Sequence, residues 1–573
     1  MLAPQRRRDT EVGVDLFTAR IDVTTLRGRR AVHRWERTSV GDVFERLTWS
    51  YPDKTAITGW AGAFGEERFA AVTYRQADEV AGQVAHALAA AGLEPGARVL
   101  LFCENSVEAF LAKIGIAKAG MVAMPMNPAL APDVQEHLIR HAQPGLAIVD
   151  AELWPRAEAA FTATGLRVAA TVTIGGGPVA GSPSFGEFVA GHPTDEPTVE
   201  IHGDDIWELL YTSGTTAMPK GVMISHSASH LAALNFTVSL TRGLRLETDL
   251  ALVCFLPVIY HVGDQIFTLS AFLAGGSLVI GRRPVPDQVA AAIESERATA
   301  VWAGSPQFVT ALTAEFDTAG RDASSLTVLV YGWGALPLET YAALRRQADP
   351  VVLGIFGQTE AIACHRFWPE KWPEVYERSA PAVNYVGLPS PLLASDVVDE
   401  TGESLRDRPG VPGEAVYRSP IVTAGYYLDE AATREAFRGG WFHSGDSAAV
   451  DGDGLRIMVD RFKDIVKSGG ENVSSIRVES VLHGHPAVER AAVIGLPHEH
   501  WGEAVTAVVV LRPGHEADEA GIIAHCRARL GGHETPKAVV VADALPQTVG
   551  GKILKYKLRV AHAGLYESPP GFG

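Results

Sequence analysis

One short stretch of the chain combines hydroxyl, glycine and lysine residues in an order suited to holding phosphate. Residues 211–222 read YTSGTTAMPKGV, with an apolar strand-like segment before them and an apolar segment leading into a helix after them. Backbone amides of such a loop can converge on an anion, hydroxyls add donors, and the lysine supplies positive charge. A flexible surface turn is the alternative, but such turns rarely carry three threonines, a serine and a Pro-Lys-Gly end together. We therefore predict a phosphate-holding loop.

The order of the residues excludes the nucleotide loop of the P-loop NTPases. That pattern requires Gly-Lys followed by serine or threonine, so that the hydroxyl can meet magnesium, whereas here Lys220 precedes Gly221. The stretch instead resembles the phosphate loop of the adenylate-forming superfamily, which contains acyl-CoA synthetases, peptide-synthetase adenylation domains and beetle luciferases. Five later segments follow the pattern of this superfamily in order. The resemblance therefore covers nearly the whole chain, from about Val72 to Arg559.

The resemblance implies contacts with ATP and Mg²⁺. In FGQTE, Thr359 would touch the α-phosphate and Glu360 would hold the magnesium ion; the first turn of a helix is the alternative setting for both residues. In GWFHSGDSAAV, Asp446 would accept hydrogen bonds from both ribose hydroxyls, unless it is a β-turn aspartate before a strand. Further nucleotide contacts are implied for Thr212, Ser213, Gly214, Thr215, Thr216, Lys220, Gly334, Phe356, Gly357, Gln358 and Arg461.

Three further segments are implied to complete or move the site. In DRFKDIVKSGGENVSS, Lys463 matches the hinge of the superfamily, and Gly469 and Gly470 would let the pantetheine arm of CoA pass close to the backbone. A solvated interdomain loop is the alternative. In PQTVGGKILKYKLR, Lys552 matches the catalytic lysine, which neutralises charge as a carboxylate attacks the α-phosphorus. In LPVIYHVGD, His261 resembles the histidine beside the acyl site; otherwise it is a satisfied core histidine.

Two other lysines near the C-terminus, Lys555 and Lys557, are expected only to be solvated. The implied reaction has two steps. ATP, Mg²⁺ and an acid give an acyl adenylate and pyrophosphate, and the small domain then rotates about Lys463 so that the thiol of CoA displaces AMP. Different faces of one mobile domain complete the site in turn. The expected function is that of an AMP-forming acyl-CoA synthetase that uses ATP, Mg²⁺ and coenzyme A.

Several residues depart from the superfamily pattern around the first half-reaction. Ala217 stands where glycine is usual, and alanine resists positive φ. Trp333 replaces a glycine or alanine on the floor between the acyl and adenine pockets, and Pro257 and His261 are separated by one residue more than usual. Two alternatives stay open: an enzyme that only converts preformed acyl-AMP to acyl-CoA, and a catalytically silent protein that binds acyl nucleotide or CoA. The presence of Lys552 argues against the second.

Large apolar and aromatic residues are the candidates for the acyl pocket, and no basic residue is evident that could hold a second carboxylate. The acid is therefore expected to be hydrophobic and bulky or cyclic. The segment SGGENVSS resembles bacterial synthetases for medium-chain, aryl and steroid or terpenoid acids, including diterpenoid-acid ligases of the platensimycin type. The candidate pocket residues are Phe255, Tyr260, Val262, Trp333 and Phe356.

The segments around these motifs alternate between strand and helix patterns. A short strand at VTY precedes helical spacing up to Gly92, RVLLFC forms a buried strand, and Ser106 caps a helix that ends near Gly120. This alternation predicts a parallel sheet with helices on its faces. Residues 173–197 are rich in Gly, Pro and Ser, which indicates a surface connection.

The secondary structure that the sequence predicts changes twice after the central α/β series. From Pro391 the segments become short and β-like, and Arg461 marks a domain boundary, followed by a loop and a helix from about Ser475. The predicted fold is α/β. Its large N-terminal domain has layered sheets with helices and a β-rich subdomain, and a small mobile α+β domain follows. The predicted limits are an N-terminal arm at 1–40, the large domain at 41–460 and the small domain at 461–573.

Composition limits the class of protein and its partners. A chain of 573 residues is too long for one core, and 47% hydrophobic with 20% charged residues is ordinary for a globular protein. The net charge of −17 argues against nucleic acid and anionic membrane as partners. The scattered residues Cys103, Cys254, Cys364 and Cys526 have no metal-ligand spacing, so buried free thiols are expected. We expect a cytoplasmic enzyme that acts on a small acid and free CoA, as a monomer or a homodimer.

Overall fold

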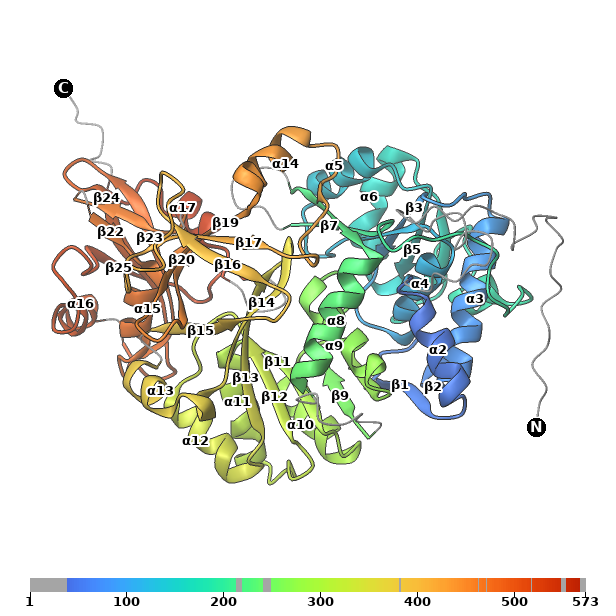
Figure 1. The fold of residues 1–573 in the computed structure, drawn as a ribbon, viewed down its shortest axis with the longest axis horizontal. Helices are drawn as coiled ribbons and strands as arrows, with labels where there is room; N and C mark the ends of the chain where they lie inside the picture. The colour runs from blue at the N-terminus through green and yellow to red at the C-terminus, as the bar shows by residue number, and fades with distance from the viewer. Residues whose placement is uncertain are drawn as a thin grey trace.

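The computed structural model describes residues 39–212, 219–240, 249–380, 383–461, 463–469, 471–516, 518–547 and 553–566. Two large sheets and one small sheet organise these residues (Figure 1). The first 38 residues of the predicted arm lie outside the described residues. Near the start of the described residues, Val40 is fully buried and donates its backbone N–H to Nδ1 of His226.

The described part of the first large sheet has seven strands. Its central strands β3, β4, β5, β6 and β7 are parallel, and β8 and β18 add an antiparallel edge beyond β7. In spatial order the strands are β18 (Gly425–Tyr426), β8 (Gly221–Ser225), β7 (Ile206–Tyr211), β4 (Val122–Pro125), β3 (Arg98–Phe102), β5 (Leu146–Asp150) and β6 (Val168–Val172).

The described part of the second large sheet has thirteen strands. It is parallel from β13 to β1 and antiparallel from β13 to β16, which is the predicted β-rich subdomain. In spatial order the strands are β16 (Ala394–Val398), β17 (Gly413–Arg418), β19 (Phe442–Val450), β20 (Arg456–Arg461), β15 (Asn384–Pro389), β14 (Ala361–Phe367), β13 (Val351–Gln358), β12 (Val328–Gly332), β11 (Ala300–Gly304), β9 (Ala251–Cys254), β10 (Ser277–Gly281), β1 (Thr55–Trp60) and β2 (Ala71–Thr73).

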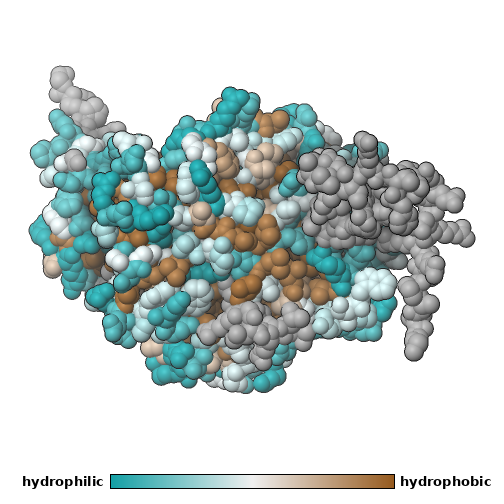
Figure 2. Space-filling view, viewed as in Figure 1, coloured by the Kyte–Doolittle hydropathy of each residue, from teal (hydrophilic) through white to brown (hydrophobic). Residues whose placement is uncertain are grey.

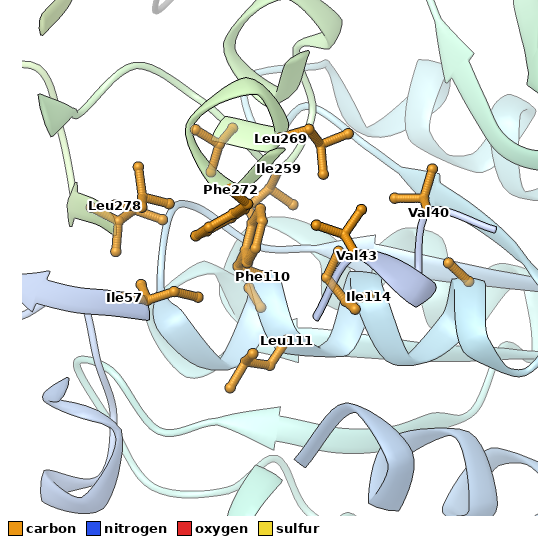
Figure 3. Packing of buried hydrophobic residues seen from close by; sticks show 14 of the residues in the cluster. Val40, Val43, Ile57, Phe110, Leu111, Ile114, Ile259, Leu269, Phe272 and Leu278 are labelled. Carbon is orange, nitrogen blue, oxygen red and sulfur yellow. The ribbon is translucent and has the colours of Figure 1, made fainter. Parts of the chain in front are cut away.

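One core fills the space between the two large sheets. Apolar side chains of the inner faces meet there with helices α2 (Asp42–Ser50), α3 (Tyr74–Ala90), α4 (Val107–Lys118), α8 (His226–Leu240) and α9 (Val262–Leu273). Helix α4 is predominantly apolar, and all of its residues are buried, including Glu108, Lys113 and Lys118. Figure 3 shows Phe110 reaching from α4 toward Phe272 of α9, and the two ring centroids are 5.9 Å apart.

The outer faces of the large sheets carry separate cores, because alternate strand residues point to opposite faces. Helices α5 (Pro132–Ala142) and α6 (Trp154–Thr164) cover the seven-stranded sheet. Helices α10 (Pro286–Ser295), α11 (Pro306–Thr318) and α12 (Leu338–Gln347) cover the parallel part of the other sheet. The shorter helices are α7 (Phe185–Val189), α13 (Pro373–Ser379) and α14 (Glu430–Ala436), with 3₁₀ turns η1 (Glu67–Phe69), η2 (Ala151–Leu153), η3 (Pro369–Lys371) and η4 (Arg438–Gly440).

The small domain has its own sheet and its own cores. The described strands are β22 (Glu471–Val473), β21 (Val466–Ser468), β24 (Gly502–Leu511), β23 (Val488–His498) and β25 (Ala538–Val541). Helices α15 (Ser475–His483) and α16 (Glu519–Arg527) cover one face, and α17 (Lys555–Ala561) covers the other. The predicted α/β class with a small α+β domain is confirmed. Among the described helices, none is long and apolar enough to cross a membrane.

Several local predictions can be compared with the structure. Ser106 accepts a hydrogen bond from the backbone N–H of Ala109 and caps α4, as predicted. Cys103, Cys254 and Cys526 are buried free thiols, also as predicted. The predicted loop after Arg461 is wrong in part, because β21 and β22 pair as an antiparallel hairpin in that segment.

Candidate active site

A hairpin carries the predicted phosphate loop. Strands β7 and β8 are antiparallel with Tyr211 opposite Gly221, and the backbone N–H of Thr212 donates to the carbonyl of Lys220 at 3.0 Å. The loop itself, which contains Ser213, Gly214, Thr215, Thr216 and Ala217, lies outside the described residues. Both ends of the loop are therefore fixed by strand pairing, and Thr212 and Lys220 lie side by side at its base.

A second hairpin carries Thr359 and Glu360. Strands β13 and β14 are antiparallel, and Gln358 pairs with Ala361 across the turn. The helical alternative for these residues is wrong, because the strand β14 follows them directly. Gly357 is exposed, and the side-chain Nε2 of Gln358 is buried without a hydrogen-bond partner among the described residues. A polar group left in this state is available to a ligand.

Tyr426 connects the two hairpins. Its hydroxyl donates to Oε1 of Glu360 at 3.0 Å, and Nζ of Lys220 lies 4.7 Å from the centroid of its ring. Burial, with the negative charge of Glu360, raises the pKa of Tyr426, so the phenol stays a donor. The second oxygen of Glu360 accepts no hydrogen bond from the described part of the chain. A half-buried carboxylate with one free oxygen, beside a cation, fits a group that holds Mg²⁺ next to phosphate.

Asp446 and Arg461 are brought together on neighbouring strands. Asp446 lies inside β19 directly opposite Arg461 of β20, and Arg461 Nε lies 3.4 Å from Asp446 Oδ1. Asp446 is 2% exposed, so the β-turn alternative for this residue is wrong. Phe356 of β13 packs against the subdomain core, with its ring centroid 6.1 Å from that of His365.

His261 and Trp333 form an edge-to-face pair. Their ring centroids are 5.7 Å apart, and His261 is the N-cap residue of α9. The extra residue between Pro257 and His261 is accommodated in one helical turn, because the backbone N–H of His261 donates to the carbonyl of Pro257 at 3.1 Å. Trp333 has a φ of 64° and is 41% exposed. A bulky residue in this left-handed region is strained, which is typical of functional sites. Gly334 follows it.

The predicted pocket residues do not all face the same side. The hydroxyl of Tyr260 donates to Oε2 of Glu104 at 2.8 Å, next to the core between the two large sheets. Val262 is the first residue of α9. Phe255 was placed wrongly, because it packs with α10 and α11 on the outer face of the thirteen-stranded sheet. A strand residue and its neighbour point to opposite faces, so Phe255 is a core residue.

The segments predicted to act as the hinge and to contact CoA follow directly after β20. Arg461 ends β20, and burial together with the charge of Arg461 lowers the pKa of Lys463. Gly469 has a φ of 63° in the turn between β21 and β22, and its N–H donates to the carbonyl of Trp501 at 2.8 Å. Its partner Gly470 and the predicted catalytic Lys552 lie outside the described residues.

Lys555 is not solvated, contrary to the prediction. Its Nζ pairs with Oε1 of Glu479 at 2.8 Å and donates to Oγ of Ser475 at 2.5 Å. Glu479, Asp460 and Asp464 raise its pKa despite the opposing effect of burial. Lys557, in contrast, is exposed as predicted.

Two polar features of the site were missed by sequence reasoning. Tyr426 lies in an unremarkable TAGYY segment, so no signal could have found it. Lys113, Glu208 and Gln265 form a buried network behind the site: Lys113 Nζ is 2.5 Å from Glu208 Oε1, and Gln265 donates to Oε2 of Glu208 at 3.1 Å. Lys113 also donates to the carbonyl of Ile259 at 2.7 Å, which ties the turn before His261 to β7. Charged residues inside apolar helix and strand patterns were the available signal.

Comparisons with known proteins place this geometry in a family. The profile of the AMP-binding enzyme family matches residues 44–427, and that of its C-terminal domain matches residues 477–552. The chain therefore belongs to the AMP-binding enzyme family, the adenylate-forming superfamily of the sequence resemblance. Within it, the chain is an acid–thiol ligase of the AMP-forming acyl-CoA ligase branch, which activates carboxylic acids with ATP.

Individual relatives agree with this placement. A feruloyl-CoA synthase of an Amycolatopsis species is 33% identical over 495 residues, which cover 85% of this chain and 94% of the relative. The long-chain fatty-acid–CoA ligase FadD13 of Mycobacterium tuberculosis is 31% identical over 501 residues, covering 85% and 92% of the two chains. The crystal structure of ATP-bound MatB from Rhodopseudomonas palustris superposes with a TM-score of 0.79 at 29% identity, covering 92% of this chain and all of MatB.

Proposed function

We propose that this ligase converts a bulky, hydrophobic carboxylic acid to its CoA thioester in two half-reactions, with the small domain moving between them. We place the domain boundary at Arg461 and the hinge at Lys463. What carries the proposal is the contact chain from Lys220 through Tyr426 to Glu360, because it joins the base of the phosphate loop to the carboxylate assigned to magnesium.

In the first half-reaction, a carboxylate oxygen of the acid attacks the α-phosphorus of ATP. The bond between that phosphorus and the bridging oxygen breaks, and pyrophosphate leaves with the electron pair. Lys220 and the hydroxyls of residues 212–216 hold the phosphates, and Thr359 contacts the α-phosphate. Mg²⁺, when held by Glu360, neutralises phosphate charge. Lys552 stabilises the negative charge that develops on the phosphoryl oxygens.

The adenosine end of the nucleotide is assigned to the β-rich subdomain. Asp446 accepts hydrogen bonds from the ribose hydroxyls, and Arg461 beside it holds the carboxylate in place and contacts ribose or phosphate. The ring of Phe356 stacks on adenine, with Gly334, Gly357 and Gln358 at the edge of the same pocket. The buried, unpartnered amide of Gln358 supports a ligand contact there.

In the second half-reaction, the sulfur of CoA attacks the acyl carbon, and the bond to the phosphate oxygen breaks. AMP leaves with the electron pair, and the thiol proton passes to solvent. Rotation about Lys463 removes Lys552 from the site and presents Gly469 and Gly470 to the pantetheine arm. Gly469 has no Cβ to hold a ligand away from the backbone, and its φ of 63° is one that residues with side chains rarely adopt.

The class of acid is assigned from the pocket residues and not from the relatives. The relatives named above act on ferulate and on long-chain fatty acids, so similarity alone does not select an acid. The aromatic pair of His261 and Trp333 beside Tyr260 supports a bulky or cyclic body, since flat apolar groups pack well on aromatic rings. A diterpenoid acid belongs in the test panel for this reason.

The experiment compares Lys552→Ala with wild type in three assays: pyrophosphate release from acid and ATP, thioester formation from acid and ATP, and thioester formation from synthetic acyl-AMP. We expect pyrophosphate release to fall by roughly 10²-fold or more, with conversion of acyl-AMP nearly unchanged. Lys557→Ala, an exposed lysine on the same segment, is the matched control and should behave as wild type. Normal thioester formation from acid and ATP by Lys552→Ala would overturn the assignment.

The same assays separate the two alternatives. An enzyme that only converts preformed acyl-AMP gives thioester from synthetic acyl-AMP and releases no pyrophosphate with any acid. The strained Trp333 on the pocket floor is the observation that favours this alternative. A silent binding protein gives no product in any of the three assays.

A further inference from the structure

A buried arginine without an acidic partner lies on the strand that follows Glu360. Arg366 of β14 is 4% exposed, and its Nη2 donates to the backbone carbonyl of Asn235 in α8 at 2.8 Å. Its Nε is buried with no hydrogen-bond partner, and none of the ion pairs among the described residues includes it. Burial alone lowers the pKa of this guanidinium, to about 10, because no neighbouring carboxylate opposes the effect.

A continuous line of aromatic rings joins Arg366 to His261. The guanidinium carbon lies 5.5 Å from the ring centroid of Phe236 in α8, and that centroid is 4.4 Å from that of Phe267 in α9. The remaining contacts are Phe267 to Trp302 at 4.6 Å, Trp302 to Trp333 at 5.7 Å, and Trp333 to His261 at 5.7 Å. We call these five rings the aromatic wall, which runs from His261 at the reacting end to Phe236 beside Arg366.

The direction of Arg366 follows from strand register. Arg366 pairs with Ile355 of β13 and Leu388 of β15, whereas its neighbour His365 pairs with Phe356 on the other face. Ile355 packs against the core between the large sheets, where α8 and α9 lie side by side (Figure 1). The arginine therefore points into the layer that also contains the aromatic wall, and not into the subdomain core beside His365.

An uncompensated buried cation is costly unless something else satisfies it. Proteins pair or hydrogen-bond buried charges, because the desolvation penalty of an isolated ion is several kcal/mol (order of magnitude). One backbone carbonyl satisfies only one of the five N–H groups of Arg366. Arg456 resembles Arg366 in part, because it also donates to one backbone carbonyl and its Nε is buried without a hydrogen-bond partner. Asp396, however, opposes the effect of burial on the pKa of Arg456, and no carboxylate does so for Arg366.

We infer that Arg366 is a specificity residue that binds an acceptor oxygen at the far end of the acyl substrate. This inference rests on the proposed function, since it extends the same acyl pocket. The substrate class is then a carboxylic acid with an apolar, ring-sized body, which the aromatic wall accommodates, and a second oxygen function opposite the reacting carboxyl. A second carboxylate is the strongest form of that function, and a phenol, keto or hydroxyl oxygen is the neutral form. The expectation that no basic residue serves the acyl pocket is thereby revised.

The test uses pairs of acids that match in ring and length and differ only in the far group: carboxylate, hydroxyl or methyl. The full-length protein is titrated with each acid by calorimetry, and kcat/KM for AMP formation is measured where turnover occurs. Wild type should prefer the oxygenated acid by at least about tenfold, because a site built to hydrogen-bond a group rejects the analogue that lacks it. Whether carboxylate or hydroxyl is preferred identifies the charge of the natural group.

Arg366→Met should abolish or reverse that preference, and Arg366→Lys should keep the preference for the carboxylate while losing part of that for the hydroxyl. The matched control is Arg456→Met. Arg456 is 8% exposed and also donates to a single backbone carbonyl, but it lies on β20 away from the aromatic wall. This control should leave the ratio between acids unchanged.

Three results would overturn the inference: equal binding of the matched acids by wild type, preference for the methyl acid, or an unchanged ratio in Arg366→Met. A ratio is independent of the fraction of folded protein, so a poorly folded variant does not imitate a change in preference. Failure of the ligase function is a different result, because it removes AMP formation with all acids while calorimetry still reports the preference for the far group.

Discussion

Two cations with little solvent exposure have opposite surroundings in this protein. Lys555, at the start of α17, is paired with Glu479 and has Asp460 and Asp464 nearby, and these acids raise its pKa. Arg366, in β14, has no acidic neighbour, and burial lowers its pKa to about 10. The first cation belongs to a cluster in which acidic side chains balance its charge. The second cation has no acidic side chain that balances its charge.

This difference distinguishes buried charged residues that stabilise the fold from buried charged residues that bind a ligand. A buried ion that serves the fold is matched by another part of the chain, because an unmatched one destabilises the folded state. A buried ion that serves a ligand can remain unmatched until the ligand arrives, and binding of the ligand then explains why it is retained. The predictions below test this distinction by removing one charge at a time.

The largest loss of stability is expected for Lys555→Met. Removal of the lysine leaves Glu479, whose side chain is 14% exposed, without its cation. The cost approaches the value for a broken buried pair, about 3–5 kcal/mol. Hydrogen exchange of the amides in α15 and β23 measures the effect where it occurs, without assuming two-state unfolding of the whole chain. Exchange in α8 and α9 should not change.

Lys557→Met is the matched control for this prediction, because Lys557 is exposed on the same helix. This substitution should change the free energy of unfolding of the small domain by no more than about 0.5 kcal/mol. Addition of Glu479→Leu to Lys555→Met should recover a large part of the loss, since an apolar pair replaces the ion pair. No recovery in the double variant would mean that packing of Lys555, and not its charge, stabilises the small domain.

A buried acid without a cation extends the comparison. Glu108, in the first turn of α4, is 1% exposed, and its Oε1 accepts backbone N–H groups of Gly65 at 2.6 Å and Glu66 at 3.0 Å. Burial raises its pKa to about 7 from the ordinary value of 4.5. The folded state therefore keeps this proton up to about pH 7, whereas the unfolded chain releases it near pH 4.5.

Wild type should consequently lose stability as pH rises from 4.5 to 7, and Glu108→Gln should not show this loss. The stability of Glu108→Gln relative to wild type should increase across this range by about 2–3 kcal/mol, at 1.36 kcal/mol per pKa unit. Hydrogen exchange of the α4 amides at pH 4.5, 6 and 8, corrected for intrinsic exchange, measures this difference in stability between the variant and wild type. A difference independent of pH would contradict the assignment of this pKa.

Sequence patterns identified the residues that we assign to the nucleotide, and missed the contacts that depend on long-range packing. The family resemblance singled out Lys220, Glu360, Asp446 and Arg461. The structure links Lys220 to Glu360 through Tyr426 and places Asp446 opposite Arg461. Tyr426 could not be found this way, because it is 66 residues from the carboxylate that it contacts. Pairing across two sheets has no local signal.

The errors at single residues have similar causes. Phe255 was assigned to the acyl pocket, but a difference of one position in a strand moves a side chain to the opposite face. Lys555 was expected to be solvated, because lysine is rarely buried without a partner and the partner Glu479 lies 76 residues earlier in the chain. Figure 2 adds that apolar residues gather on the exposed side of α8, where Leu234 and Val238 are 46% and 53% exposed, so hydropathy alone does not report burial.

Trp333 offers a smaller test, of strain in place of charge. Its φ of 64° is a conformation that glycine adopts freely and other residues adopt at a cost of about 1–2 kcal/mol. Trp333→Gly and Trp333→Ala both remove the ring contacts with His261 and Trp302, and only glycine relieves the backbone. The glycine variant should therefore be the more stable of the two by about 1 kcal/mol, although alanine is normally the more stable residue. Thermal unfolding of both variants measures which is more stable. A more stable alanine variant would contradict the claim that the backbone of Trp333 is strained.

The smallest effect on stability is expected where the most conspicuous charge is removed. Arg366→Met deletes a buried cation that has no acid to leave behind, so the lost hydrogen bond to Asn235 is offset by relief of desolvation. The free energy of unfolding should change by less than about 1 kcal/mol in either direction. Denaturant unfolding followed by tryptophan fluorescence measures this, with Arg456→Met, near Asp396, as the comparison. If Arg366→Met instead costs as much as Lys555→Met, the arginine serves the fold, and the distinction between matched and unmatched buried charges fails for this protein.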